Sequence, residues 1–186
     1  MPEPASPDLV HLAQEGDMAA LGTLYDQHHG LIYRYLRARL GDQHTAEDLT
    51  GEVFQRMLAG LPSYRAQGLP FRAWLFRIAH NLLVDHYRRA GRGLQVEWQD
   101  SSRTVDVGAD PAHQVEHTLT LEHAYRALAA LDDHQREVVT LRFLSGLSLR
   151  ETALALGKSE DAIKALQRRG LAALRLALAG EAGERE

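Results

Sequence analysis

The stretch SLRETALALGKSEDAIKALQRRG, residues 148–170, contains two short helical patterns separated by a glycine. Ser148 and Glu151 have the S-x-x-E spacing that caps a helix N-terminus. Ser159 is placed to cap a second helix, whose first turn is acidic, as the helix dipole favours. Apolar side chains recur at three- and four-residue intervals, so each predicted helix has one inward face. That face comprises Leu149, Ala153, Leu156, Ile163, Leu166, Gly170 and Leu174.

The outward face of the second predicted helix is basic. It carries Lys164, Ala165 and Arg168, with Asp161 in the first turn and Arg169 at its margin. Two helices joined by a short glycine turn, with basic side chains on the exposed side of the second, are typical of a helix-turn-helix that binds the DNA major groove. A helical hairpin with a solvated basic face has the same spacing. The spacing alone does not separate these two interpretations.

The composition favours helices throughout the chain. The 186 residues, 45% of them apolar, can bury a core, and this size allows one large domain or two small ones. Ala, Leu, Arg and Glu dominate whereas Val, Ile and Thr are sparse, so we predict an all-α fold. The absence of cysteine excludes disulfides, thiolate zinc sites and cysteine nucleophiles. We expect a soluble cytoplasmic protein, because no signal-like or membrane-spanning apolar run is present.

Charge is strongly segregated along the chain, although the formal net charge is only −4. Residues 94–122 contain six acids against one arginine, which gives −5. Residues 71–92 contain five arginines against one aspartate, which gives +4. Because binding follows the local charge, the net negative charge does not exclude nucleic acid as a partner.

Capping and turn signals divide the rest of the chain into helices. Asp17 caps a long helix that Gly41 ends, and Thr45 opens the next one. The long helix has an apolar stripe that includes Leu21, Tyr25, Ile32 and Tyr35. The predicted helices cover residues 8–15, 17–40, 45–60, 71–89, 119–131 and 132–144, before the two of the opening stretch.

Periodicity disappears after Gly91, where turn-forming and acidic residues accumulate. We therefore predict two small helical domains, residues 1–91 and 119–180. A flexible acidic linker over residues 92–118 would join them, and residues 181–186 would form a disordered tail.

The helix predicted over residues 71–89 has two distinct faces. Its buried stripe comprises Phe71, Trp74, Leu75, Ile78 and Leu82. A second face comprises Arg77, Asn81, Val84 and Arg88, and Asp85 is spaced to pair with Arg89. Arginines, an amide and a flanking aromatic suit single-stranded or partly melted DNA. A solvated basic surface with Trp74 in the core fits this helix alone equally well.

The helix predicted over residues 45–60 has an acidic face formed by Asp48, Glu52 and Gln55. Such a face is usually only solvated, but it can also dock a basic partner protein. The ten histidines follow no metal-ligand spacing, and the sequence has no glycine-rich phosphate loop or nucleophile elbow. We therefore predict no metal, no cofactor and no catalytic residues.

Three segments, in this order, resemble the extracytoplasmic-function (ECF) class of bacterial RNA polymerase sigma factors. AEDLTGEVFQRML, residues 46–58, resembles the region-two helix that binds the polymerase clamp coiled coil. SYRAQGLPFRAWLFRIAHNLLVDHYRR, residues 63–89, resembles the promoter-melting loop and −10 helix of that class. LDDHQREVVTLRFLSGLSLRETALALGKSEDAIKALQRRGLAALR, residues 131–175, is similar to region four, which binds the −35 element.

This resemblance favours the helix-turn-helix interpretation and implies a site for each segment. Core polymerase would contact Asp48, Glu52 and Gln55. The −10 element would contact Tyr64, Arg65, Trp74, Arg77, Asn81 and Arg88. The −35 element would contact Ser159, Lys164, Ala165, Arg168 and Arg169. Where many members of the class have Gly-Thr, this chain has Asp161-Ala162, so their particular −35 contacts do not carry over there.

The resemblance also implies partners and a mechanism. The chain would bind the clamp coiled coil and flap of core RNA polymerase, direct promoter recognition and melting, and perform no bond chemistry. Its linker would thread toward the polymerase active-site cleft. An anti-sigma factor, often membrane-tethered in this class, could mask the same surfaces and hold the chain near the membrane. Two alternatives are a sigma mimic that sequesters an anti-sigma factor and a stand-alone helix-turn-helix repressor.

Overall fold

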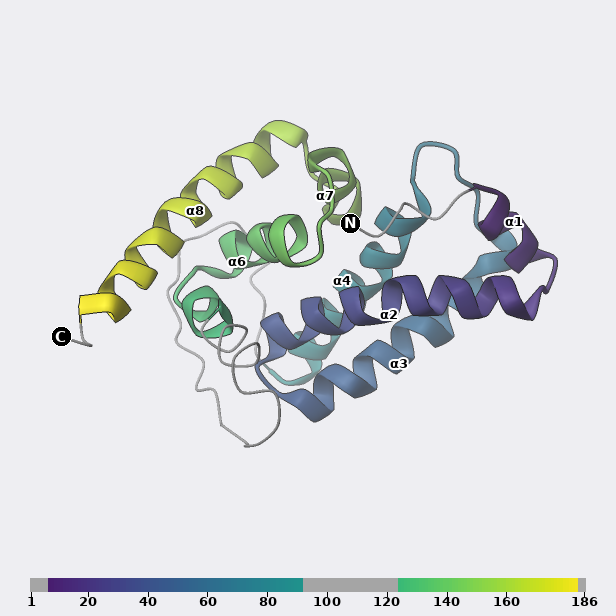
Figure 1. Cartoon of the computed structure of the whole chain (residues 1–186), viewed down its shortest axis with the longest axis horizontal. Helices are drawn as coiled ribbons and strands as arrows, with labels where there is room; N and C mark the ends of the chain where they lie inside the picture. The colour runs from purple at the N-terminus through teal and green to yellow at the C-terminus, as the bar shows by residue number, and fades with distance from the viewer. Residues whose placement is uncertain (1–6, 92–123, 184–186) are drawn as a thin grey trace.

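The structure, a computed structural model, describes residues 7–91 and 124–183, and their regular structure is helical throughout (Figure 1). This confirms the predicted all-α fold. We call residues 7–91 the first half and residues 124–183 the second half. The linker predicted over residues 92–118 lies outside the described residues.

The first half is built from four α-helices. They are α1 (Pro7–Gln14), α2 (Met18–Leu40), α3 (Gln43–Gly60), which leads into a 3-10 turn η1 (Leu61–Ser63), and α4 (Phe71–Arg89). The carboxylate of Asp17 accepts hydrogen bonds from the backbone N–H groups of Ala19 and Ala20, at 2.8 and 3.0 Å. Gly41 ends α2 at a φ of 73°, a left-handed conformation that glycine adopts without steric cost. Both predicted ends of α2 are therefore confirmed.

Helix α3 begins earlier than predicted. Asp42, and not Thr45, is its N-cap, because Asp42 Oδ2 accepts a hydrogen bond from the backbone N–H of Thr45 at 2.7 Å. A carboxylate is among the strongest caps, and its negative charge also favours the helix N-terminus. The hydrogen bonds from Thr45 hold the pKa of Asp42 below its ordinary value.

The buried stripe of α2 is rotated slightly from the predicted one. Leu24, Ile32 and Tyr35 are fully buried, whereas Tyr25 is 44% exposed and not buried as predicted. The Tyr25 ring lies at the edge of the stripe, 4.7 Å from the Phe54 ring centroid. An aromatic ring at such an edge packs one face and leaves its hydroxyl in water.

The second half contains the helix-turn-helix. Residues 124–129 are helical and are followed by α6 (Asp133–Val139), a wide π-turn η2 (Thr140–Leu144), α7 (Leu149–Leu156) and α8 (Glu160–Gly183). The Ser148–Glu151 capping box is present, and Ser159 Oγ accepts from the backbone N–H of Ala162 at 3.2 Å. These caps confirm the two predicted helix starts. Helix α8 continues to Gly183, past the expected end at residue 180.

Gly170 allows α8 to approach α6 closely. A Cβ atom at this position would lie only 2.7 Å from Val139 Cγ2, so no other residue fits without a shift. Ile163 and Leu166 are buried beside Val138 and Ala153, which confirms the predicted inward face. The outer face of α8 is fixed by this packing.

The two halves pack against each other, with α7 beside α4 and η2 beside α2 (Figure 1). Leu141, Leu147 and Ala155 of the second half belong to the same buried cluster as the core of the first half. Ala38 of α2 in turn packs with buried leucines and a valine of the second half. The described halves therefore share a core.

Candidate polymerase and DNA interfaces

The acidic side of α3 points away from the core. Asp48 and Gln55 are exposed, and Glu52 is partly exposed. The predicted opposite face is buried, and it comprises Ala46, Val53, Phe54 and Met57. Glu52 Oε1 lies 2.6 Å from the Arg56 guanidinium one turn later. Such a surface pair contributes little to stability and can exchange partners readily.

The loop between η1 and α4 is braced by an aromatic cluster. The Tyr64 ring lies 5.7 Å from Phe71 and 4.7 Å from Trp74, and its hydroxyl donates to the Leu69 carbonyl at 2.8 Å. Tyr64 is only 7% exposed, and burial raises the pKa of its phenol. Arg65 is exposed beside it. Of these two predicted −10 residues, Arg65 alone presents its side chain to solvent in this arrangement.

Trp74 joins the loop to the end of α3. Its ring packs over Gly60, where a Cβ atom would lie 3.0 Å from Trp74 Cζ2. The side chain is partly exposed, so it belongs both to the core and to the surface beside the loop.

The predicted DNA face of α4 is only partly open. Asn81 and Arg88 are exposed, whereas Arg77 is partly buried and donates a hydrogen bond to the Leu154 carbonyl of α7. Arg88 lies 3.4 Å from Asp85, so the predicted Asp85–Arg89 pair is wrong. Arg89 instead contacts the backbone carbonyl of Asp85 at 3.4 Å. On a helix, side chains at i+3 and at i+4 can both reach a carboxylate at i, and here Arg88 at i+3 does so.

The outer face of α8 is open to solvent. Lys164, Arg168 and Arg169 are exposed, and Ala165 between them is partly exposed. Lys164 Nζ lies 3.1 Å from Asp161 Oδ1, with both side chains more than half exposed. Asp161 therefore has a local partner in addition to its favourable place in the first helical turn.

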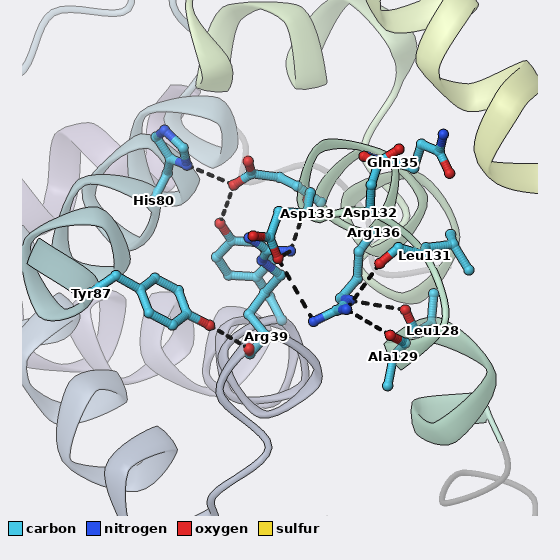
Figure 2. Close-up of polar contacts among 12 residues, drawn as sticks. Arg39, His80, Tyr87, Leu128, Ala129, Leu131, Asp132, Asp133, Gln135 and Arg136 are labelled. Atoms are coloured by element: carbon cyan, nitrogen blue, oxygen red, sulfur yellow. Dashed lines mark hydrogen bonds and ion pairs between the residues drawn. The ribbon is translucent and has the colours of Figure 1, made fainter. Parts of the chain in front are cut away.

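A largely buried polar cluster, which we call the clasp, lies between the halves, and its exposed member is Asp133 with a 53% exposed side chain (Figure 2). Its centre is Glu137 of α6, whose Oε1 accepts from the Tyr35 hydroxyl of α2 at 2.8 Å and lies 2.6 Å from His80 Nδ1 of α4. Arg39 of α2 donates to the backbone carbonyl of Asp133 at 2.8 Å and lies 3.7 Å from its carboxylate. The clasp thus consists of Tyr35, Arg39, His80, Asp133 and Glu137.

Neighbouring groups of the clasp shift the pKa values of Glu137 and Tyr35. Burial would raise the pKa of Glu137, but the charge and hydrogen bond of His80, the charge of Arg39 and the hydrogen bond from Tyr35 lower it to about 2. Burial and the neighbouring Glu137 charge raise the pKa of Tyr35 well above its ordinary value. Glu137 therefore stays ionised although it is buried.

Arg136 supports the clasp from inside the second half. Its guanidinium donates to the carbonyls of Leu128, Ala129 and Leu131 at 2.8–2.9 Å (Figure 2). The Leu128 and Ala129 carbonyls lie at the C-terminal end of the helix over residues 124–129, where a cation is favourable, and Leu131 follows in the bend after it. The arginine therefore ties this helix to α6 next to Glu137.

Sequence reasoning did not find the clasp. Tyr35 was predicted to be buried, and a buried tyrosine hydroxyl usually needs a hydrogen-bond partner. That signal could have indicated a polar contact. It could not identify Glu137, which is 102 positions away in the chain.

Comparison with known proteins agrees with this division into two halves. The Sigma-70 region 2 family model matches residues 24–93, and the Sigma-70 region 4 model matches residues 127–176. The chain is 42% identical over 167 residues to the ECF RNA polymerase sigma factor BldN of Streptomyces coelicolor, covering 90% of this chain. The chain belongs to the ECF sigma factors. The resemblance found in the sequence is thereby confirmed.

Other relatives differ in length and in similarity. The matched part spans 63% of BldN. The ECF RNA polymerase sigma factor ShbA of Streptomyces griseus is 37% identical, with 90% of this chain and 92% of ShbA covered. Among solved structures, CnrH in complex with the cytosolic domain of CnrY has a TM-score of 0.72 and 26% identity, with 95% and 98% of the two chains covered. None of the helices described in this sigma factor is long and apolar enough to cross a membrane.

Proposed function

We propose that this ECF sigma factor binds core RNA polymerase, directs it to promoter DNA and helps to open the duplex. The observation that carries the proposal is the separation of three exposed polar surfaces, on α3, on α4 with its preceding loop, and on α8. The protein would act through binding and not through bond chemistry. Melting would be driven by capture of unstacked bases on the protein surface.

The docking face for polymerase would be Asp48, Glu52 and Gln55 on α3. Their exposure opposite the buried side of the helix makes them available to a basic partner, and electrostatic complementarity gives such a contact its specificity and rate. We infer that the partner surface is the clamp coiled coil, with a second contact between the second half and the flap.

The −10 surface would be formed by Asn81 and Arg88 of α4 together with Arg65 of the loop. An exposed amide can hydrogen-bond the edge of a splayed base, whereas arginines mainly contact phosphates. Tyr64 and Trp74 would hold the loop in shape beside them, as their ring packing suggests. Arg77 would join this surface after leaving the Leu154 carbonyl.

The −35 surface would be the outer face of α8 in a major groove. Lys164 and Arg168 lie one turn apart on the exposed side and can reach base edges, with Ala165 in close contact between them. Arg169 is better placed for phosphate. Ser159 would fix the start of the helix, as its hydrogen bond to the Ala162 N–H indicates.

Membership of the class supports an inference about the cellular setting. We infer that the protein acts in the cytoplasm, at the nucleoid, and that an anti-sigma factor controls it. The exposed basic residues on both DNA faces favour a DNA-binding sigma factor over a mimic that only sequesters an anti-sigma factor.

Run-off transcription with purified core polymerase over a promoter library tests the proposal. We expect transcripts that depend on this chain and that share −10 and −35 motifs. The double variant Asp48→Lys, Glu52→Lys should give none. Absence of chain-dependent transcripts, together with tight binding of an operator by a dimer without polymerase, would identify a repressor instead.

A further inference from the structure

The side chain of Gln14 joins the last turn of α1 to the loop before α4. Its amide nitrogen Nε2 donates to the Leu61 carbonyl at 2.9 Å and to the Tyr64 carbonyl at 2.8 Å. Leu61 begins the 3-10 turn η1, which lies beside α1, and Tyr64 caps the end of that turn (Figure 1). These two hydrogen bonds, which we call the Gln14 bridge, therefore span η1 at the start of the loop.

The Tyr64 carbonyl also holds Arg65, a predicted −10 residue. Arg65 Nη1 donates to this carbonyl at 2.9 Å and to the Pro62 carbonyl at 3.2 Å. A carbonyl oxygen has two lone pairs, so Gln14 and Arg65 can donate to the same acceptor together. A guanidinium has several further N–H donors, and the Arg65 side chain is exposed, so donors remain for DNA. The place of this guanidinium thus depends on a carbonyl that Gln14 fixes.

Helix α1 gives the Gln14 bridge a fixed origin. Val10 and Ala13 of α1 are 6% and 4% exposed and belong to the core of the first half. The backbone N–H of Asp17 donates to the Leu12 carbonyl at 3.0 Å, which ties the end of α1 to the cap of α2. Gln14 itself is half-buried, so its hydrogen bonds are partly shielded from water.

A role in packing alone would not require a glutamine at this position. Ordering a glutamine side chain costs more conformational entropy than ordering a leucine. What the amide adds is direction, because it fixes two backbone carbonyls of the turn. The Tyr64 ring, 4.7 Å from the Trp74 ring, holds the same residue from the side of α4. The start of the loop is therefore held from both sides.

We propose that Gln14 is a positioning residue for the −10 surface. By bridging η1 it sets the place of Arg65, and through Arg65 it acts on capture of the melted strand. Helix α1 would thereby take part in promoter opening without contacting DNA. This consequence rests on the proposed function, whereas the hold of the Gln14 bridge on the loop does not, so the two are tested separately.

The first experiment observes the loop in the free chain through the fluorescence of Trp74. The chain has two tryptophans, so Trp98→Phe gives a parent in which Trp74 is the single one. Gln14→Met keeps a similar side-chain length and removes both donors. Because Tyr64 packs on Trp74, a loosened turn should roughly double the rate constant for acrylamide quenching, while circular dichroism stays helical. Gln14→Glu, whose carboxylate donates no hydrogen bond, should act in the same direction.

Gln27→Met is the matched control. Gln27 of α2 is also half-buried in the first half, but its buried Oε1 has no hydrogen-bond partner among the described residues. This variant makes the same chemical change without removing a hydrogen bond to the described loop residues, so its quenching should match that of the parent. Unchanged quenching in the Gln14 variants, or an equal rise in Gln27→Met, overturns the Gln14 bridge.

The second experiment measures the rate of open-complex formation with purified core RNA polymerase on a duplex promoter selected by the unmodified holoenzyme. Gln14→Met should slow opening on the order of tenfold, the effect of one or two hydrogen bonds. With Arg65→Ala already present, the same change should slow opening by less than about twofold more, because Gln14 acts through Arg65. Equal losses in the two backgrounds, or no loss in either, overturn the positioning role.

Failure of the proposed function gives a different result. In that case the unmodified chain forms no open complex with core polymerase, and a role in promoter opening is excluded for Gln14 as well. Faster quenching of Trp74 in Gln14→Met would still establish that the Gln14 bridge holds the loop.

Discussion

The two basic helices α4 and α8 differ in how much of their charge is available. Helix α8 packs one side on the second half and leaves Lys164, Arg168 and Arg169 in solvent. Helix α4 lies between the first-half core and α7, so that Arg72 and Arg77 are bound to carbonyls while Asn81 and Arg88 remain exposed. Similar local charge thus gives an open surface in one half and a partly covered one in the other. Charge along a sequence indicates a binding surface, but packing decides whether it is free.

The largest effect is expected from loss of core polymerase binding, because we expect promoter contact by both α4 and α8 to depend on it. Asp48→Lys with Glu52→Lys should abolish co-purification with core polymerase, because reversed charges repel a basic docking surface. Circular dichroism and the melting temperature should change little, since these side chains lie on the exposed side of α3. The matched reversal Asp8→Lys with Glu15→Lys, on exposed acids of α1 and the turn after it, should retain core binding. Undiminished binding by the α3 variant would remove this docking face.

A substitution in the shared core beside α4 should lower the free energy of unfolding more than a substitution near the end of α8. Leu141→Ala should lower the free energy of unfolding by about 2–5 kcal/mol, because Leu141 is fully buried where η2 packs on the first half. Leu178→Ala, 46% exposed on α8, should change it by less than about 0.5 kcal/mol. Chemical denaturation measures both. Similar losses for the two variants would mean that the halves do not share a core in solution.

Acid should lower the free energy of unfolding through His28, which is buried beside Phe71 of α4. Burial, and secondly the Arg72 charge, lower the pKa of His28 from 6.5 to about 4. The unfolded chain then binds a proton at His28 before the folded chain does, so stability is full above pH 6.5 and falls as the pH drops toward 4. At about 1.4 kcal/mol for each pKa unit, the loss reaches about 3 kcal/mol.

The matching variant is His28→Gln, which removes the titrating group. Its free energy of unfolding should fall less steeply between pH 6.5 and 4 than that of the unmodified chain. Parallel slopes for the two chains would show that His28 is not protected from protonation by the fold.

A smaller effect on promoter binding is expected from substitutions on α8, whose outer face is open to solvent. Arg168→Ala should relax sequence preference within the −35 element, at about 1–3 kcal/mol of discrimination for one base contact. Arg169→Ala should weaken all promoters alike and reduce the salt dependence of binding. Holoenzyme binding to a randomised −35 library at two salt concentrations separates these results. If the selected motif survives Arg168→Ala, α8 lies differently in the groove.

The parts of the fold that depend on neighbouring residues could be predicted from the sequence. The Ser148–Glu151 box and the apolar spacing around Ile163 each act within one or two helical turns, and both are confirmed. Two of the predictions that failed involved near-equivalent choices. Asp42 and Thr45 both suit a helix start, and Arg88 and Arg89 can both reach Asp85.

The clasp lay beyond such reasoning because it depends on the meeting of three helices, α2, α4 and α6, that are far apart in the sequence. Nothing near Glu137 in the sequence indicates that a tyrosine and a histidine from the other half surround it. The same limit applies to α4. Its basic face could be predicted from spacing, but the coverage of Arg77 by α7 follows only from the packing of the halves.

The difference between α4 and α8 can be measured directly by hydroxyl-radical footprinting on a promoter selected by the holoenzyme. At saturating concentration, the free sigma factor should protect only the −35 element, because α8 is open while α4 is partly covered. With core polymerase added, both elements should be protected. Protection of the −10 element by the free chain, equal to that of the −35 element, would contradict the account.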